Sequence, residues 1–192
     1  MQHRFRLHAA NALTALRVLL TPVFAGALCW SGRALLVGIL AGVVFAVVAA
    51  SDVVDGRLAR RWGSASAGGR TFDHLADIGF ILTALVTYAL LGIAPWWVPA
   101  AVAGSFAFYV FDSWSRASTV APGLVGSQIG HVAGVLNYAL VGVLVFNNTA
   151  GIHLLPEAVL SKLFWLVPIY STLAVATRLV GRREAVPVTQ LG

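Results

Sequence analysis

The chain of 192 residues is 59% hydrophobic and only 10% charged, and its mean hydropathy is +0.85. A typical soluble domain is about 45–50% apolar and about 25% charged. This composition excludes a water-soluble globular protein, a disordered chain and a disulfide scaffold, and it indicates that lipid is the main solvent. The net charge of +6 does not indicate nucleic acid as a partner, because the basic residues lie in short clusters between apolar runs.

Six charge-poor segments are long enough to cross about 30 Å of hydrocarbon, so we expect an all-α membrane protein with six transmembrane helices. In chain order, these spans are 12–30, 34–51, 74–93, 95–112, 128–148 and 158–178. Gly92, Pro95 and Pro99 predict the break between the third and fourth spans. Basic residues before the first apolar run also occur in signal peptides, but we interpret this run as the first span. We expect one domain over 1–192, with a frayed tail over 184–192.

The basic residues also predict the orientation of these spans. Most of them fall in segments on one side, whereas only Arg33 and Lys162 fall on the other. An excess of Arg and Lys marks the cytoplasmic side of a membrane. Both termini and the 52–77 region are therefore expected in the cytoplasm, on a multi-pass protein of the cytoplasmic membrane.

Four of the five aspartates lie between positions 52 and 77. Asp52 and Asp55 are three apart at the end of the second span, and Asp73 and Asp77 are four apart at the start of the third, so each pair shares one helical face. Glycines between the pairs permit a tight turn that brings the two helix ends together. Converging carboxylates repel unless a cation neutralises them, and their oxygens suit Mg²⁺ or Mn²⁺. We expect a two-metal site that clamps a diphosphate; the alternative is a set of solvated charges paired with neighbouring arginines.

These aspartates belong to a longer pattern, which reads Asp52-x2-Asp55-Gly56-x2-Ala59-Arg60-x8-Gly69-x3-Asp73-x3-Asp77. The pattern resembles the signature of the CDP-alcohol phosphotransferase family at every fixed position. The segment Asn11-Ala12-Leu13-Thr14-Ala15-Leu16-Arg17 is similar to the family's first-helix entry. Six spans also suit the membrane domain of that family.

The resemblance implies a role for each matching residue. Asp52, Asp55 and Asp73 would bind a first metal ion, and Asp52, Asp73 and Asp77 a second. Asp77 would also be the general base that takes the proton of the acceptor hydroxyl. Residues that would surround the nucleotide-linked lipid, with Arg60 on its diphosphate, are Gly56, Ala59, Arg60, Ser66, Gly69, Asn11 and Thr14.

The resemblance further implies an enzyme that transfers a phosphatidyl group from CDP-diacylglycerol to an alcohol and releases CMP. The small size and the first helix favour glycerol 3-phosphate as the acceptor, while phosphatidylglycerol (a cardiolipin synthase), inositol phosphate, serine and choline stay open. A polyprenyl-diphosphate transferase is disfavoured, because its two acidic motifs lie far apart on more spans. A non-enzymatic membrane component that binds divalent ions is also disfavoured, because ion pathways usually place carboxylates at mid-membrane. Family members are often homodimers, and the glycine-rich spans permit one.

Some polar residues outside the pattern have two interpretations. We expect His74 to be an interfacial side chain directed away from the face of Asp73 and Asp77. Asp112 and Arg116 are four apart, which favours a salt bridge within one helix, although Arg116 is also a candidate for binding an acceptor phosphate.

Further polar residues lie within the expected spans or at their ends. His131 is either a contact for an anionic acceptor or a plain interfacial histidine. Asn137 and Tyr138 are expected to form hydrogen bonds between helices. Arg17 and Arg178 either extend to the interface or line the pocket.

Overall fold

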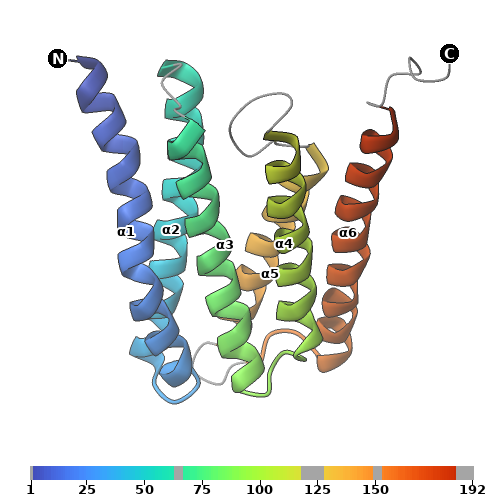
Figure 1. Ribbon diagram of the computed structural model, residues 1–192. Coiled ribbons are helices and arrows are strands. Elements are labelled where there is room, and N and C mark those ends of the chain that lie inside the picture. Colours follow the sequence, from blue (N-terminus) through green and yellow to red (C-terminus); the bar gives the residue numbers. More distant parts are fainter. Residues whose placement is uncertain (1, 63–66, 118–127, 149–152, 185–192) are drawn as a thin grey trace, which may run out of the picture.

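A computed structural model describes residues 2–62, 67–117, 128–148 and 153–184 of the chain. Within these ranges the protein is all-helical, as expected, with six helices and no strand (Figure 1). The helices are α1 (Gln2–Ser31), α2 (Leu35–Trp62), α3 (Ala67–Leu90), α4 (Trp97–Ala117), α5 (Gln128–Asn147) and α6 (Glu157–Glu184). Apart from Glu184, the expected tail lies outside the described residues.

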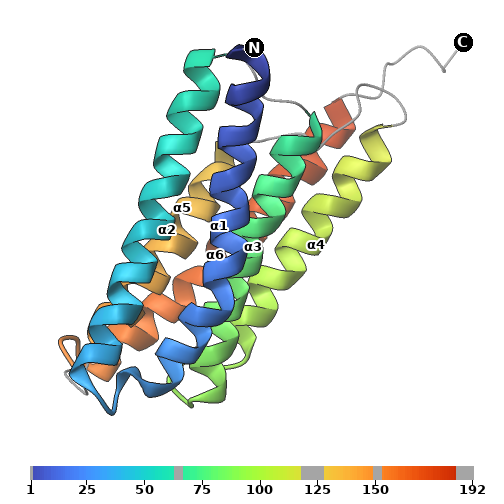
Figure 2. The ribbon, with the colours of Figure 1, turned by 90° about the vertical axis from the view of Figure 1, so that its left-hand side faces the viewer.

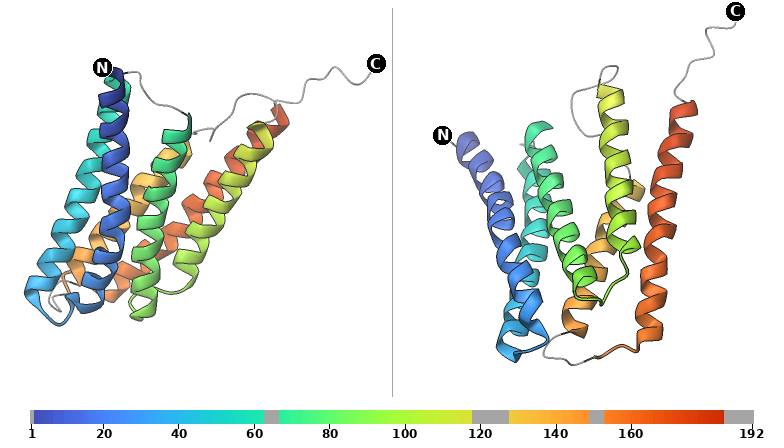
Figure 3. Two further views of the ribbon diagram at one scale, coloured as in Figure 1. Left: turned by 60° about the vertical axis from the view of Figure 1, so that its left-hand side comes forward. Right: turned by 60° about the horizontal axis from the view of Figure 1, so that its bottom comes forward.

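The helices form two rows of three. One row contains α1, α3 and α4, and the other contains α2, α5 and α6. Each helix packs on its neighbours in the row and on one helix of the other row, in the pairs α1 with α2, α3 with α5, and α4 with α6 (Figures 2 and 3). Helix α3 therefore contacts α1, α4 and α5, and α1 begins at the same end of the bundle at which α6 ends (Figure 1).

Five helices contain a segment that is long and apolar enough to cross a membrane, namely α1, α2, α3, α5 and α6. This confirms the expected polytopic all-α class. Helix α4 coincides with the expected 95–112 span and has 21 residues, about 32 Å of helix, but it is not among these five. The crossing of α4 therefore stays a prediction.

The surface of the bundle is apolar. Leu36 is 80% exposed and Leu19 is 69% exposed, which water would not favour but lipid tails would. Trp30 and Trp165 are also exposed, and both lie toward the end of the bundle at which α1 ends and α6 begins (Figure 1). Tryptophan is common at membrane interfaces, so these two residues are consistent with a boundary at that end.

The connection between α3 and α4 depends on one glycine. Gly92 has φ of +72°, which L residues with a side chain rarely adopt. The Ile93 N–H and the Gly92 N–H donate to the carbonyls of Tyr88 and Ala89 at 2.9 and 3.1 Å, the arrangement that closes a helix end. The expected break at Gly92 is thus confirmed.

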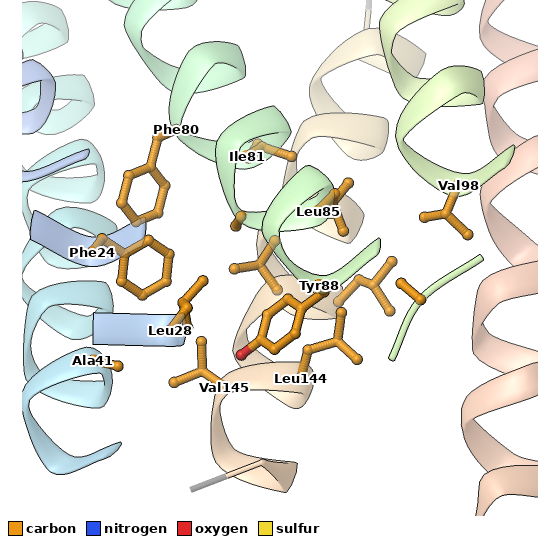
Figure 4. Packing of buried hydrophobic residues seen from close by; sticks show 14 of the residues in the cluster. Phe24, Leu28, Ala41, Phe80, Ile81, Leu85, Tyr88, Val98, Leu144 and Val145 are labelled. Atoms are coloured by element: carbon orange, nitrogen blue, oxygen red, sulfur yellow. The ribbon is translucent and has the colours of Figure 1, made fainter. Parts of the chain in front are cut away.

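The apolar core includes buried residues of all six helices, and Figure 4 shows part of it. Phe24 of α1 and Phe80 of α3 are fully buried, and their rings stack with centroids 4.7 Å apart. Leu85, Tyr88 and Leu144 continue the core along α3 and α5. Helix α3 carries Asp73 and Asp77 near its start and enters this core further along. Packing of the core therefore holds the start of α3, with its two aspartates, at one end of the bundle.

Candidate metal centre

The three motif aspartates whose side chains are described converge from two helices. Asp52 lies on α2, and Asp73 and Asp77 lie one turn apart near the start of α3. All three contact the same guanidinium, that of Arg17 on α1. Their side chains are 36%, 31% and 20% exposed, respectively, so each remains accessible from outside the bundle.

Helix α1 supplies the inner wall of this site through two residues three positions apart. Arg17 is fully buried; its Nη1 donates to Asp73 Oδ1 at 3.0 Å and pairs with Asp77 Oδ1, and its Nη2 lies 3.5 Å from Asp52 Oδ1. Thr14 Oγ1 donates to Asp73 Oδ1 at 3.1 Å. Positions three apart share one helical face, so both side chains reach α3 together. Of the two interpretations of Arg17, the structure supports the one that lines the site.

Helix α5 adds a further hydrogen bond. Tyr138 donates its hydroxyl to Asp77 Oδ1 at 2.8 Å, and its ring stacks on Phe80 with centroids 6.2 Å apart. On the next helix, Tyr170 donates its hydroxyl to Asn137 Oδ1. The expected interhelical hydrogen bonds of Asn137 and Tyr138 are both confirmed.

The position of His74 differs from the expectation. Ligand atoms of Asp73, His74 and Asp77 all lie within 4.8 Å of one another, so the imidazole is not directed away from the carboxylates. A helix rotates about 100° per residue, but an imidazole is long enough to swing back toward its neighbour's carboxylate. The His74 ring is exposed and also lies near Tyr109, with ring centroids 6.2 Å apart.

The donor set fits a hard divalent cation. Three carboxylates supply oxygen atoms, the preferred ligands of Mg²⁺ and Mn²⁺, and one imidazole lies beside them. With the guanidinium of Arg17 counted, the formal charge of the three aspartates and Arg17 is −3 + 1 = −2. A divalent cation would balance this charge, which agrees with a metal-binding role for the cluster.

A second polar cluster joins α4 to α6. Asp112 is fully buried, and Arg178 Nη1 donates to its Oδ2 at 3.0 Å. The Arg178 guanidinium also lies 4.2 Å from the centroid of the Tyr109 ring. The expected salt bridge of Asp112 with Arg116 is not tested, because the Arg116 side chain lies outside the described part; Arg178 is an additional partner that no local spacing predicts.

The side chains of several predicted site residues lie outside the described part of the structure. They lie on α1 (Asn11), α2 (Asp55, Gly56, Ala59 and Arg60), α3 (Gly69) and α4 (Arg116). Ser66 lies outside the described residues altogether. His131 is exposed near the start of α5. Among the predicted residues, the structure thus brings together Thr14, Asp52, Asp73 and Asp77.

Arg17 and Tyr138 also contact the described carboxylates, but the sequence left Arg17 with two interpretations and predicted only an interhelical hydrogen bond for Tyr138. Arg17 carried a signal, because a charge within an apolar span usually faces a polar partner inside the bundle. Tyr138 carried none, since its contact with Asp77 joins residues 61 positions apart.

The fold and the site together define a class of protein: a polytopic helical membrane protein with a carboxylate site toward one end of its bundle. A family model described as CDP-alcohol phosphatidyltransferase matches residues 7–178, so the chain belongs to this family. The match extends from the first turns of α1 into α6, and it confirms the resemblance drawn from the motif.

Two relatives illustrate the similarity. Over 90 residues, the chain is 40% identical to a probable phosphatidylglycerophosphate synthase of Mycobacterium tuberculosis (strain H37Rv). This aligned segment covers 46% of this chain and 43% of that protein. Over 81 residues, it is 42% identical to a cardiolipin synthase (CMP-forming) of Streptomyces coelicolor. This second aligned segment covers 42% of this chain and 34% of that protein. The matched segments thus span less than half the length of these curated relatives.

Proposed function

We propose that this protein is an integral-membrane enzyme that transfers a phosphatidyl group from CDP-diacylglycerol to an alcohol and releases CMP, in phospholipid synthesis. The observation that carries the proposal is the convergence of Asp52, Asp73 and Asp77 on one guanidinium, in a chain that belongs to the CDP-alcohol phosphatidyltransferase family. The partly exposed carboxylates offer a polar site on a bundle that also exposes many apolar side chains.

In this reaction the four motif aspartates, Asp52, Asp55, Asp73 and Asp77, would hold Mg²⁺ or Mn²⁺. Bound metal ions would supply positive charge to the diphosphate of the substrate. Asp77 would accept the proton of the acceptor hydroxyl. The acceptor oxygen then forms a bond to the β-phosphorus, the bond from this phosphorus to the CMP oxygen breaks, and CMP leaves with that electron pair.

The described contacts suit Asp77 for this role. Tyr138 and Arg17 both contact its Oδ1. Holding one oxygen of a carboxylate fixes the direction of the other, which is the geometry that a positioned proton acceptor needs. Thr14 and Arg17 contact Oδ1 of Asp73 in the same way.

The nucleotide-linked lipid would lie beside these carboxylates. Residues proposed to contact it are Asn11, Thr14, Gly56, Ala59, Arg60, Ser66 and Gly69. Arg60 would bind the diphosphate, because a planar guanidinium donates several hydrogen bonds to phosphate oxygens. The acyl chains would stay in the bilayer, beside the apolar surface of the bundle.

Glycerol 3-phosphate is the acceptor that we favour, which would give phosphatidylglycerol phosphate. The similarity to a probable phosphatidylglycerophosphate synthase supports this choice. Arg116 and His131 are the proposed contacts for the phosphate of the acceptor. Phosphatidylglycerol is a second candidate, because the chain is also similar to a cardiolipin synthase (CMP-forming).

We also propose that the site faces the cytoplasm, with both termini on that side of the cytoplasmic membrane. The distribution of basic residues supports this orientation: Arg33 and Lys162 lie toward the end of the bundle that is opposite the aspartates. A homodimer is compatible with the family and with the glycine-rich spans.

The proposal is tested by CMP release from purified protein in detergent micelles with CDP-diacylglycerol and Mg²⁺ or Mn²⁺. Acceptors to compare are glycerol 3-phosphate, phosphatidylglycerol, inositol phosphate, serine and choline, with identification of the lipid product. We expect metal-dependent CMP release with glycerol 3-phosphate, which Asp77→Asn abolishes.

Glu157→Gln provides the matched control, since it removes one carboxylate charge at the opposite, exposed end of α6. We expect this variant to keep the wild-type rate. Release with phosphatidylglycerol alone would establish the second candidate. No CMP release with any acceptor, from folded protein that binds Mn²⁺, would refute the proposed reaction.

A further inference from the structure

Among the described residues, Arg17 places a positive charge against the carboxylates that would bind the metal. We propose that Arg17 is a built-in counter-cation that competes with the divalent cation for Asp73 and Asp77 and keeps these carboxylates together when no metal is bound. This inference rests on the metal site of the proposed function, and it assigns to α1 a control over metal affinity.

The burial of Arg17 is the first argument. Its side chain is fully buried, and it lies within the Thr14–Ser31 segment that can cross a membrane. An arginine inside a membrane span normally extends to the interface or pairs with an acidic group, because an unpaired charge there is costly. Here the guanidinium faces inward to three carboxylates, which are themselves partly exposed.

The second argument is that the guanidinium contacts the oxygens that a metal would use. Arg17 Nη1 donates to Asp73 Oδ1 at 3.0 Å and pairs with Asp77 Oδ1. Carboxylate oxygens are also the atoms that bind Mg²⁺ or Mn²⁺. A cation that approaches these oxygens therefore meets a fixed positive charge a few ångströms away, and like charges at that distance repel even in a polar medium.

The third argument concerns folding without metal. Asp73 and Asp77 lie one turn apart on α3, and Asp52 approaches them from α2. Carboxylates held this close repel one another. The guanidinium is the described group that offsets this repulsion on the inner side of the site, so its loss should weaken the metal-free protein most.

These two effects are thermodynamically linked. If Arg17 stabilises the metal-free protein more than the metal-bound one, then its removal must raise the affinity for metal by the same factor. A residue that merely packs in the bundle would lower stability equally in both states and leave the affinity unchanged.

The experiment uses the full chain in detergent micelles, with Arg17→Gln as the test variant. Mn²⁺ binding is measured from the EPR signal of free Mn²⁺, and the thermal unfolding midpoint is measured in EDTA and in saturating Mn²⁺. Arg178→Gln is the matched control, because Arg178 is also buried against an aspartate but on α4 and α6. Both readouts are independent of catalysis.

We expect Arg17→Gln to bind Mn²⁺ about tenfold more tightly than the wild type and to lose more thermal stability in EDTA than in Mn²⁺. The control Arg178→Gln should lose the same stability under both conditions and keep the wild-type affinity. An affinity of Arg17→Gln that is equal to or weaker than that of the wild type would overturn the inference and leave the proposed function standing.

Two further outcomes have a defined meaning. A wild-type protein that binds no Mn²⁺ would overturn the proposed metal site and this inference with it. If Arg17→Gln does not fold, the affinity of Asp52→Asn is compared with that of the double variant Arg17→Gln/Asp52→Asn, in which one carboxylate fewer needs a counter-charge. The same tightening is then required, and its absence overturns the inference.

Discussion

The ion pair between Asp112 and Arg178 gives the sharpest test of how this bundle is held together. Asp112 is fully buried, Arg178 is 8% exposed, and Arg178 Nη1 lies 3.0 Å from Asp112 Oδ2. Removing one partner of a buried ion pair takes a counter-charge away from the other, which costs about 3–5 kcal/mol, whereas replacing both partners by apolar residues is often nearly neutral. We therefore expect Arg178→Met to lower the free energy of unfolding by about 3–5 kcal/mol. The double variant Asp112→Leu/Arg178→Met should lie within about 1 kcal/mol of the wild type.

The free energy of unfolding is measured by titration with SDS in mixed micelles for the wild type, both single variants and the double variant. The four values give the coupling energy between Asp112 and Arg178. A double variant whose loss equals the sum of the two single losses would refute the reasoning, because the two charges would then act independently. A loss below about 1 kcal/mol in Arg178→Met would refute it as well, since the pair would then behave like one at an exposed surface.

Two further predictions concern packing and positioning. A methyl group added at Gly142 would lie 3.0 Å from two ring atoms of Phe45, so we expect Gly142→Ala to lower the free energy of unfolding by about 1–3 kcal/mol. A methyl group added at Gly134 would meet no described atom within 4 Å. In the same SDS titration, Gly134→Ala should therefore leave the free energy of unfolding unchanged or raise it. Tyr138→Phe removes the hydrogen bond to Asp77 Oδ1, and we expect it to lower kcat for CMP release roughly tenfold to a hundredfold with little change in the KM for CDP-diacylglycerol. An unchanged kcat in this variant would mean that the hydrogen bond does not position the carboxylate.

The helices were largely predictable, because their signal is local. Charge-poor runs of about 20 residues mark the spans, and each of the six expected segments coincides with a helix. The break at Gly92 was predictable for the same reason, since glycine permits the positive φ that ends α3. Helix α2 extends ten residues past Asp52, well beyond its expected span. The sequence could not show this extension, because a hydropathy pattern marks where lipid ends and not where a helix ends.

Only part of the site was predictable. Asp52, Asp73 and Asp77 were predictable because the motif spacing places them on helix faces at the ends of two adjoining expected spans. Arg17 and Tyr138 reach them from α1 and α5, and both contacts depend on which helices are neighbours in the bundle. Sequence spacing carries no information about such neighbours, so both residues had open or purely structural interpretations. His74 was placed wrongly because a helical wheel gives the direction of Cβ, and a long side chain can depart from it.

The sharp change from polar to apolar packing along α3 explains why the site lies where it does. Asp77 is held by Arg17 and Tyr138, and less than one turn later Phe80 is fully buried and stacks on Phe24. A charge cluster deeper in the bundle would need every carboxylate to be paired inside the protein. At this position the inner oxygens have protein partners, while the partly exposed outer side remains accessible to a polar ligand. The exposed surface beside it is apolar and suits lipid chains, so this boundary is where a headgroup and its acyl tails can both be in their preferred surroundings.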